Sequence, residues 1–421
     1  MKSFDGQSAG VQPAASAKGN GGGVEAAPFR VLHIVAAGEY GGAEAQVLDL
    51  LKGLGANGVP AAVAVLFDAE FAARARDAGV EVHVLPGGAP WRDFGALLRL
   101  VRQWRPDLLH THGVRASVAG RLVGVRTGLR VVTTVHSDLY YDYAAPAKRA
   151  LFMALELATQ ELSARVIAVS RPLAGVLRKR GYAERKLRVV ENGIDVRAFE
   201  EKLSYATHDG SGANIRRELA LPDGALVILC VARLHPVKLH DVLIRATGEL
   251  GKTMDAVHLV LVGDGSERAA LQALATQAAP GRVHFLGARA DVPALLAQAD
   301  VFALTSRMEG LPISVLEAMA ARLPVVASRA GGLAELVADA GAVAADRTTV
   351  QDAPTGFLFE PGSTEGLRAA LAILLRDAGL RRELGAAGRE RLLARFTTER
   401  MVQGTMDVYR ETASYVNASV V

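Results

Sequence analysis

The sequence predicts an α/β protein made of two domains, each built on a parallel β-sheet. Short apolar runs of strand length alternate with segments of helical periodicity from about residue 30 to the end. The chain has 421 residues, which is too long for one ordinary hydrophobic core. A polar stretch from Glu201 to Asn214 separates two such series of strands and helices.

The first domain is expected to span residues 29–198. Residues 1–28 are rich in Gly, Ala and Ser, show no periodicity, and are expected to form a disordered tail. The turn Asn192–Asp195 closes the first series of strands. The predicted strands of this domain are Arg30–Ala36, Ala61–Leu66, Leu108–His110, Val131–Val135 and Val166–Val169.

Residues 199–214 are expected to form a linker, and residues 215–397 a second domain. The second series of strands begins at Leu226 and continues with His258–Val262, Val283–Phe285, Val301–Leu304, Val325–Ala327 and Gly356–Phe359. Three helical segments close the chain, namely Leu367–Leu375, Leu380–Phe396 and Thr398–Val416.

The composition excludes several classes of protein. No apolar run approaches the roughly 18 to 20 residues that a membrane span needs. The first 28 residues lack the basic and apolar regions of a signal peptide. Cys230 is the only cysteine and lies in an apolar run, so we expect an inert core thiol and no intrachain disulfide. These features favour a soluble cytoplasmic protein.

The charge is distributed unevenly along the chain. The net charge of +4 is too small to indicate nucleic-acid binding, but residues 1–195 carry +6 and residues 196–421 carry −2. Basic residues gather in the segments Arg99–Arg105 and Arg178–Arg188. Such patches hold some proteins reversibly on anionic lipid at the inner face of the cytoplasmic membrane. The alternative, slightly favoured here, is a solvated helix face.

The segment from Glu309 to Glu317 is the most informative part of the sequence. It lies between two predicted strands, so Glu309 follows the carboxyl end of the first strand and Pro312 begins a helix. Open α/β sheets bind ligands at that edge. Glu317 lies more than a turn inside the helix, where no cation is three or four residues away. A buried carboxylate needs hydrogen-bond donors, which ligand hydroxyls would supply. The alternative is a capping Glu309 and a Glu317 that reaches water or a distant Arg.

This arrangement resembles the E-x7-E signature of the retaining, nucleotide-sugar-dependent glycosyltransferases of family 4. The resemblance extends from Phe29 to the C-terminus. It implies the GT-B fold, in which two Rossmann-like domains face each other across a cleft and the last helix, here residues 398–421, returns to the first domain. It also implies that Glu309 contacts the donor sugar and Glu317 the ribose, with Gly310 and Leu311 beside them in the substrate site.

Further motifs support the resemblance. Gly41 and Gly42 follow the first strand, where glycines let the backbone approach an anion, and they are expected to line the diphosphate and acceptor side of the cleft. Arg233 and Lys238 follow the strand of the second domain that begins at Leu226, and they resemble the family's Arg-x4-Lys pair, which neutralises the donor diphosphate. Taken alone, the two cations fit a surface pair as well. Leu239 departs from the Gly that usually follows that Lys, so the phosphate loop is expected to be wider or displaced.

Single residues at other strand ends complete the predicted site. His136 follows the strand Val131–Val135, and the resemblance implies a contact with the donor sugar. His110 and His112 are interpreted as cleft-lining or capping rather than as metal ligands, because no carboxylate or Cys cluster completes a set. Gly263 and Gly331 also lie at strand-to-helix turns, and both are expected to contact substrate.

The resemblance implies a metal-independent hexosyltransferase that uses a nucleoside diphosphate sugar and no cofactor. The expected acceptor is a glycan or a lipid-linked molecule in cell-envelope or exopolysaccharide synthesis. Two alternatives remain open at this point: a nucleotide-sugar epimerase on the same fold, and a non-catalytic protein that binds the donor. Residues 338–354 are longer and more polar than the family pattern, and form either a surface insertion or a flap beside the donor.

Overall fold

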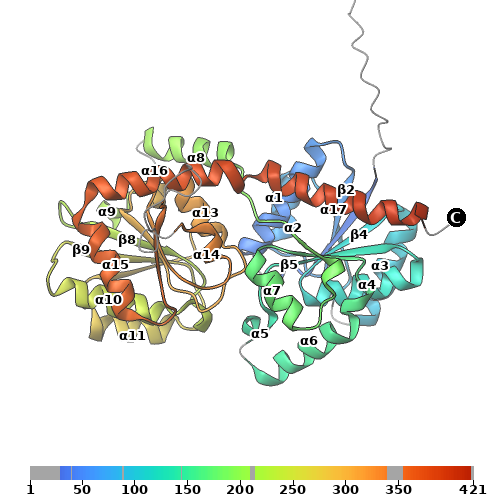
Figure 1. The fold of residues 1–421 in the computed structure, drawn as a ribbon, viewed down its shortest axis with the longest axis horizontal. Helices are drawn as coiled ribbons and strands as arrows, with labels where there is room; N and C mark the ends of the chain where they lie inside the picture. The colour runs from blue at the N-terminus through green and yellow to red at the C-terminus, as the bar shows by residue number, and fades with distance from the viewer. Residues whose placement is uncertain are drawn as a thin grey trace, which may run out of the picture.

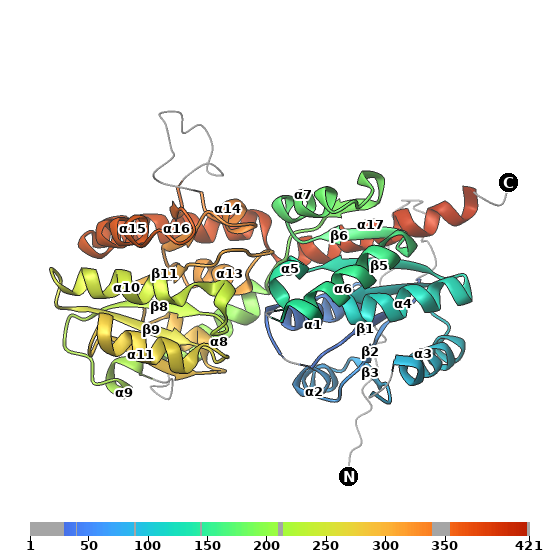
Figure 2. The same ribbon diagram turned by 90° about the horizontal axis from the view of Figure 1, so that it is seen from below.

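The protein folds into two α/β domains that lie side by side (Figure 1). The computed structural model describes residues 29–38, 40–87, 90–143, 145–208, 214–338 and 354–418. The predicted tail and nearly all of the 338–354 insertion therefore lie outside the described residues. Each domain is built on a sheet of parallel strands with helices on both faces (Figure 2).

The first domain contains a seven-stranded sheet in the order β3-β2-β1-β4-β5-β6-β7, with parallel neighbours throughout. The chain leaves β1 in one direction along the sheet and continues in the other from β4, so the loops after these strands form the crevice typical of doubly wound folds. The strands are β1 (Val31–Val35), β2 (Ala61–Val65), β3 (Glu81–Val84), β4 (Leu108–His112), β5 (Arg130–Val135), β6 (Arg165–Ala168) and β7 (Leu187–Val189).

In the described part of the first domain, the α-helices that connect these strands are α1 (Gly42–Ala56), α2 (Glu70–Asp77), α3 (Pro90–Trp104), α4 (Val114–Thr127), α5 (Leu139–Asp142), α6 (Pro146–Thr159) and α7 (Arg171–Lys179). Most of these helices bury an apolar face. In α6, by contrast, Thr159 is the buried residue among those described, while Leu151 and Leu157 are exposed.

The second domain contains a six-stranded parallel sheet in the order β10-β9-β8-β11-β12-β13. Its crevice lies after β8 and β11, the two strands that precede Arg233 and Glu309. Cys230 is buried in β8, and burial raises the pKa of its thiol to about 12, as expected for an inert core residue. The strands are β8 (Leu226–Val231), β9 (Val257–Val262), β10 (Val283–Gly287), β11 (Val301–Leu304), β12 (Val325–Ser328) and β13 (Gly356–Phe359).

The helices of the second domain are α8 (Val196–His208), α9 (Ile215–Glu218), α10 (His240–Gly251), α11 (Arg268–Ala278), α12 (Val292–Leu296), α13 (Ile313–Ala320), α14 (Leu333–Leu336), α15 (Thr364–Arg376) and α16 (Ala378–Arg395). Helix α13 is the predicted helix after Pro312, which is its N-cap residue rather than its first residue.

Part of the predicted linker is helical. Residues 199–208 lie in α8, which contacts α12 and α13 of the second domain. The physical reason is the spacing of Val196, Phe199 and Leu203, which places three apolar side chains on one face of a helix and packs them into the core. Residues 209–213 of that linker lie outside the described residues.

The last helix returns to the first domain, as the fold class predicts. Helix α17 (Thr398–Ala418) contacts α1 and β5, and Figures 1 and 2 both place it on the first domain while α16 lies on the second. Its buried residues Met401, Val402 and Tyr409 belong to the same apolar cluster as Val31 of β1. The first domain therefore shares part of its core with the end of the chain.

Two strands of the first domain were not predicted. Strands β3 and β7 are the two edges of the sheet, and both are short. All four residues of β3 are at least partly exposed, so neither strand appears in the sequence as a buried apolar run. Across the described residues, no helix combines the length and apolar character needed to cross a membrane.

Candidate functional site

A cleft of about 590 Å³ lies between the two domains. Its walls come from the loops that follow β1 and β5 in the first domain and β8, β9 and β11 in the second. Ten of the eleven residues predicted for the site line this cleft: Gly41, Gly42, His136, Arg233, Lys238, Gly263, Glu309, Gly310, Leu311 and Glu317. The eleventh, Gly331, lies behind Glu309.

Lys238 and Glu309 form an ion pair on the wall of the second domain. The Lys238 Nζ lies 2.5 Å from Glu309 Oε1, and the same carboxylate oxygen accepts a hydrogen bond of 2.5 Å from Ser306 Oγ. Both charged side chains are largely buried, so each fixes the orientation of the other. This contact joins the two predicted motifs of the second domain into one unit.

Leu239 adopts a left-handed backbone conformation, with φ +50° and ψ +45°. Glycine occupies such positions without steric cost, which explains the glycine usual in the resembling family. Here Thr305 stabilises the turn, because its Oγ1 lies within hydrogen-bonding distance of the Lys238 and Leu239 carbonyl oxygens, at 2.7 and 2.9 Å. The turn therefore keeps Lys238 on the cleft wall with leucine in the glycine position.

Glycines allow the backbone segments of the site to approach closely. A Cβ atom on Gly310 would lie 1.9 Å from the carbonyl oxygen of His136, so a side chain at this position would push the two domains apart. Gly331 has φ +52°, and a Cβ atom there would lie 1.9 Å from the carbonyl oxygen of Glu309. Gly331 lies at the predicted strand-to-helix turn between β12 and α14, where it supports the Glu309 loop from behind.

Glu317 faces the cleft without a partner for its carboxylate among the described residues. Burial raises its pKa to about 7, an effect opposed by the charge of Lys202 and reinforced by that of Asp49. An ordered carboxylate of this kind can accept hydrogen bonds from ligand hydroxyls. The alternative pairing with a distant Arg does not occur within the described part of the chain.

The amino-terminal ends of α1 and α13 face each other across the cleft. A Cβ atom on Gly42 would lie 3.6 Å from Ile313 Cγ1, an ordinary contact distance. Gly41 is the N-cap residue of α1, and its N–H donates to Glu44 Oε2 at 3.2 Å. Gly263 has φ +135° and lies against the carbonyl of Ala232, so it closes the same end of the second sheet.

Asn192 is a cleft residue that sequence reasoning treated only as part of a turn. Its Nδ2 donates to the carbonyl oxygen of Leu311 at 2.8 Å and so links the two domains. Its buried Oδ1 has no hydrogen-bond partner among the described residues. A second link joins Glu335 to the backbone N–H of Arg171, with a distance of 3.1 Å. The Asn-Gly turn at the domain boundary was the available signal for Asn192.

The prediction that His110 lines the cleft or caps a helix is wrong. His110 is fully buried behind the cleft, where its Nδ1 lies 2.5 Å from the Tyr409 hydroxyl and its Nε2 lies 2.7 Å from Thr134 Oγ1. His112 lines a second cavity, and its Nδ1 lies 3.1 Å from His136 Nε2. Strands β1, β4 and β5 are neighbours, which brings these side chains together.

Two family models match the chain. The one described as Glycosyl transferases group 1 matches residues 212–391, and the one described as Glycosyltransferase Family 4 matches residues 40–198. The two matched regions correspond to the second and the first domain. The chain belongs to the group 1 glycosyltransferases of family 4. This result confirms the family that the Glu309–Glu317 segment and the Arg233–Lys238 pair resemble.

Relatives of this glycosyltransferase act on different substrates. A D-inositol 3-phosphate glycosyltransferase of Salinispora arenicola is 32% identical over 326 residues, which cover 72% of this chain and 68% of that protein. The aligned part of the Salinispora tropica protein of the same name is 64% of its length. An N-acetyl-alpha-D-glucosaminyl L-malate synthase of Bacillus anthracis is 27% identical, covering 72% of this chain and 74% of that protein.

Solved structures share the fold of this glycosyltransferase. Anabaena Alr3699/HepE in complex with UDP-glucose matches with a TM-score of 0.74 and 23% identity, covering 92% of this chain and 100% of that chain. WaaG, a glycosyltransferase involved in lipopolysaccharide biosynthesis, matches with a TM-score of 0.67 and 18% identity, covering 90% and 99%. These matches confirm the predicted GT-B architecture.

Proposed function

We propose that this glycosyltransferase moves a hexose from a nucleoside diphosphate sugar to a glycan or lipid-linked acceptor, with retention of the anomeric configuration. We place the reaction in cell-envelope or exopolysaccharide synthesis. The observation that carries the proposal is the interdomain cleft, in which Arg233 and the Lys238–Glu309 pair face the glycine turn Gly41–Gly42.

Departure of the nucleoside diphosphate is the step that most needs stabilisation. Arg233 offers a planar set of donors and Lys238 a point charge, and both lie on the cleft wall. The N–H groups at the start of α1 add positive potential from the opposite wall. Preorganised charge of this kind is commonly the largest catalytic term, and it requires no metal ion or cofactor in this proposal.

The sugar and the ribose would bind along Glu309–Glu317. Glu309, held by Lys238 and Ser306, is positioned to accept hydrogen bonds from hydroxyls of the transferred sugar. Glu317 would accept hydrogen bonds from the ribose. Gly310, Leu311 and Gly263 would allow close approach of the backbone to the ligand, and Gly331 would support Glu309.

Retention in this proposal needs no protein nucleophile. The leaving phosphate would accept the acceptor proton on the face from which it departs, while His136 contacts the donor sugar from the first domain. Burial lowers the pKa of His136 to about 4, so the imidazole is neutral at physiological pH. Closure of the two domains would exclude water and protect the sugar donor from hydrolysis.

Two rival functions make different predictions. An epimerase would release the nucleoside diphosphate transiently and return an altered sugar without an acceptor, and a non-catalytic protein would bind the sugar donor unchanged. The complete set of Arg233, Lys238, Glu309 and Glu317 in one cleft favours transfer. Diphosphate release that depends on an added acceptor separates the three functions.

A thermal-shift screen tests the proposal. The purified protein is mixed with UDP, GDP, ADP and their common sugar conjugates, in buffer containing EDTA, because ligands that bind only the native state raise Tm. A shift with one nucleotide family is the expected result and identifies the base. No shift with any of these ligands at millimolar concentration would contradict the proposal at its first step.

Reversible association with anionic membrane is the second part of the proposal. Four of the six basic residues in the segment 178–188 form ion pairs with carboxylates: Arg178, Arg180, Lys186 and Arg188. The exposed Leu151 and Leu157 of α6, with Lys148 and Arg149 near its start, offer a better surface for lipid. Sedimentation with vesicles containing anionic lipid should show binding that weakens as the salt concentration rises. The absence of binding at low salt would contradict the proposed membrane association.

A further inference from the structure

A second cavity, of about 500 Å³, lies within the first domain next to the cleft. It is lined by residues of α1, α4, α6, α7 and the segment after β5. His136, Ser137 and Asp142 line both cavities, so the second cavity adjoins the cleft at the expected sugar position. Its volume is within the range of sites that enclose a small organic ligand.

The wall of this second cavity is mainly apolar. Its side chains include Val47, Val114, Leu139, Met153, Leu157 and Leu177. A glycan covered with hydroxyl groups would leave many of its polar atoms without partners against such a wall. A hydrocarbon chain would be favoured by about 25 cal/mol for each Å² of apolar surface removed from water.

The charged groups on this wall are already paired with other protein groups. Glu156 accepts two hydrogen bonds from Arg121, at 2.9 and 2.8 Å, and a third from the Tyr182 hydroxyl. Arg180 forms an ion pair with Asp138, and Asp142 accepts from Ser137 Oγ at 2.8 Å. These groups therefore have less capacity left to bind the hydroxyls of a polar ligand.

We propose that this cavity binds the hydrocarbon portion of the acceptor. The acceptor is then an amphiphile, in which an alkyl or prenyl chain carries the hydroxyl or sugar that receives the hexose at His136. This inference rests on the proposed transferase function and narrows its acceptor from two classes to one. The exposed Leu157 of α6 lines the same cavity, which suits an acceptor drawn from a lipid surface.

Calorimetric binding of two glycosides tests this inference on the full chain. We expect n-decyl β-D-glucopyranoside, below its micelle concentration, to bind at least tenfold more tightly than methyl β-D-glucopyranoside. Met153→Glu places a charge in the cavity and should weaken decyl glucoside binding at least tenfold. Val125→Glu adds the same charge on the exposed face of α4, outside the lining of the cavity, and should leave that binding unchanged. Val114→Trp fills the cavity without adding charge and should also weaken decyl glucoside binding. It replaces Met153→Glu if that variant does not fold.

Equal binding of the two glycosides would overturn the inference. So would equal losses in Met153→Glu and Val125→Glu, which would indicate adsorption to the surface of the first domain. The nucleotide thermal shift is recorded on the same samples. A retained shift without decyl glucoside binding rejects the apolar acceptor alone, whereas loss of both rejects the transferase function as well.

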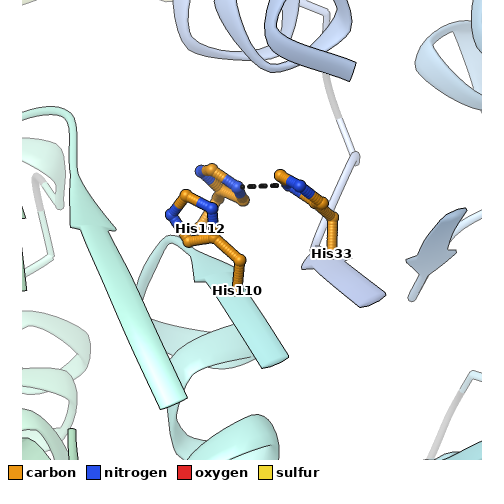
Figure 3. Close-up of side chains that lie close together, drawn as sticks. All are labelled: His33, His110 and His112. Carbon is orange, nitrogen blue, oxygen red and sulfur yellow. Dashed lines mark hydrogen bonds between the residues drawn. The ribbon is translucent and has the colours of Figure 1, made fainter. Parts of the chain in front are cut away.

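A separate observation concerns the histidines behind the cleft. His33 of β1 and His110 and His112 of β4 lie close together, and Figure 3 shows the three rings with the contact between His33 and His112. His33 Nδ1 lies 3.1 Å from His112 Nε2, and His33 Nε2 lies 3.3 Å from the Tyr409 hydroxyl. Together with the contacts of His110 and His136, they form one chain of hydrogen bonds from Thr134 to His136.

Hydrogen bonding rather than metal binding accounts for this cluster. The ligand atoms of the three histidines lie within 4.8 Å of one another, as a metal site would need. However, every ring nitrogen of the three has a hydrogen-bond partner in the described structure. Burial lowers the pKa of His33 to about 3 and holds the pKa values of His110 and His112 well below the usual value. These imidazoles are therefore neutral, and each donates from one nitrogen and accepts at the other.

The direction of this chain follows from Thr134. Its Oγ1 is buried, and within the described structure its hydrogen-bond partner is His110 Nε2. The hydroxyl therefore donates to that nitrogen, and His110 carries its proton on Nδ1 and donates to the Tyr409 oxygen. Tyr409 then donates to His33 Nε2, since an unsatisfied buried donor is costly.

The same rule continues to the cleft. His33 donates from Nδ1 to His112 Nε2, and His112 donates from Nδ1 to His136 Nε2. His136 is left with its proton on Nδ1, the buried ring nitrogen that has no partner among the described residues. We infer that Thr134 and Tyr409 are positioning residues, which fix the tautomer of His136 with its proton on Nδ1.

Nitrogen NMR of histidine-labelled protein tests this inference, because long-range proton–nitrogen couplings distinguish the two neutral tautomers. We expect His33, His112 and His136, each assigned by its His→Gln variant, to share the Nδ1–H tautomer at pH 7. Thr134→Val and Tyr409→Phe should remove the preference at His136. Thr133→Val, which removes a buried hydroxyl of the same strand that contacts Thr111 and Ser163 instead, should retain it.

Any Nε2–H signal dominating one of the three residues in the wild type would overturn the chain as drawn. Unchanged tautomers in both Thr134→Val and Tyr409→Phe would overturn the positioning role. The purified protein could instead contain stoichiometric zinc or another transition metal, whose removal by a chelator changes the histidine signals. That result would show that the histidines coordinate a metal and would overturn the chain of hydrogen bonds.

Discussion

The two walls of the cleft carry their polar groups in different forms. On the second domain, the charged side chains of Lys238 and Glu309 form an ion pair, and Arg233 lines the same wall. On the first domain, a neutral His136 stands at the end of a chain of hydrogen bonds, next to an apolar cavity. The comparison indicates that the second domain stabilises the charge of the departing diphosphate, whereas the first domain orients the sugar. Variants in the two walls should therefore fail in different ways.

Arg233→Ala should have the largest effect on activity. Removing one preorganised charge from the leaving-group site is expected to lower kcat about 100-fold or more, on the scale of losing an oxyanion donor. Steady-state kinetics with the sugar donor identified by thermal shift provides the measurement. Arg245→Ala, an exposed cation of α10 away from the cleft, serves as the control. A kcat of Arg233→Ala within threefold of the wild-type value would contradict the role of Arg233 in stabilising the leaving group.

Gly310→Ala should damage the contact between the walls. Its Cβ would lie 1.9 Å from the His136 carbonyl oxygen, so the domains must shift at a cost of about 1–3 kcal/mol. Thermal unfolding should show a lower Tm, together with weaker nucleotide binding. Gly55→Ala in α1 meets no atom within 4 Å and should be neutral or slightly stabilising. Equal Tm values for the two variants would contradict the close approach.

Glu317→Gln should change stability in a pH-dependent way. Because burial raises the pKa of Glu317 to about 7, the folded state holds its proton more tightly than the unfolded chain does. Below about pH 4.5, Glu317 is protonated in both the folded and the unfolded state and does not change the free energy of unfolding. Above pH 7, its ionisation lowers the free energy of unfolding by about 1–3 kcal/mol. The variant should therefore gain Tm at pH 8 and little at pH 5. The exposed Glu390→Gln should show no such difference, and equal gains at both pH values would contradict the shift.

Leu239→Gly should have the smallest effect. Glycine relieves the left-handed conformation, worth about 1 kcal/mol, but loses a partly buried leucine side chain of similar value. The two terms nearly cancel, so denaturant unfolding should give a change below about 1 kcal/mol, with nucleotide affinity retained. Leu239→Val adds a β-branch at the same φ and should destabilise more. A large loss of affinity in Leu239→Gly would show that leucine itself shapes the phosphate loop.

The fold and the location of the cleft could be predicted because they depend on local patterns. Buried strands such as β11 are continuous apolar runs, and the rule that ligands bind at the carboxyl ends of parallel strands leads to Arg233, Glu309 and His136. The edge strands β3 and β7 could not be predicted in this way, since all residues of β3 are at least partly exposed and β7 has three residues with an arginine in the middle.

The supporting residues of the site depend on contacts between distant parts of the chain. Thr305 contacts carbonyls 66 and 67 positions away, and Asn192 contacts a carbonyl 119 positions away. His33 lies inside an apolar strand, so nothing local distinguishes it from a core residue, and its partner Tyr409 is 376 positions away. A single sequence contains no local signal for such pairs.

The returning helix α17 also affects the order in which the protein can fold during synthesis. The last strand of the first domain ends at Val189, but its core needs Met401 and Tyr409, which lie about 200 residues later. At roughly 5–20 residues per second, the ribosome takes about 10–40 s to synthesise that interval. During that time the growing chain exposes the apolar groove that α17 will fill, and the histidines behind it are open to water. We therefore expect this glycosyltransferase to depend on chaperones that cover the groove until synthesis is complete.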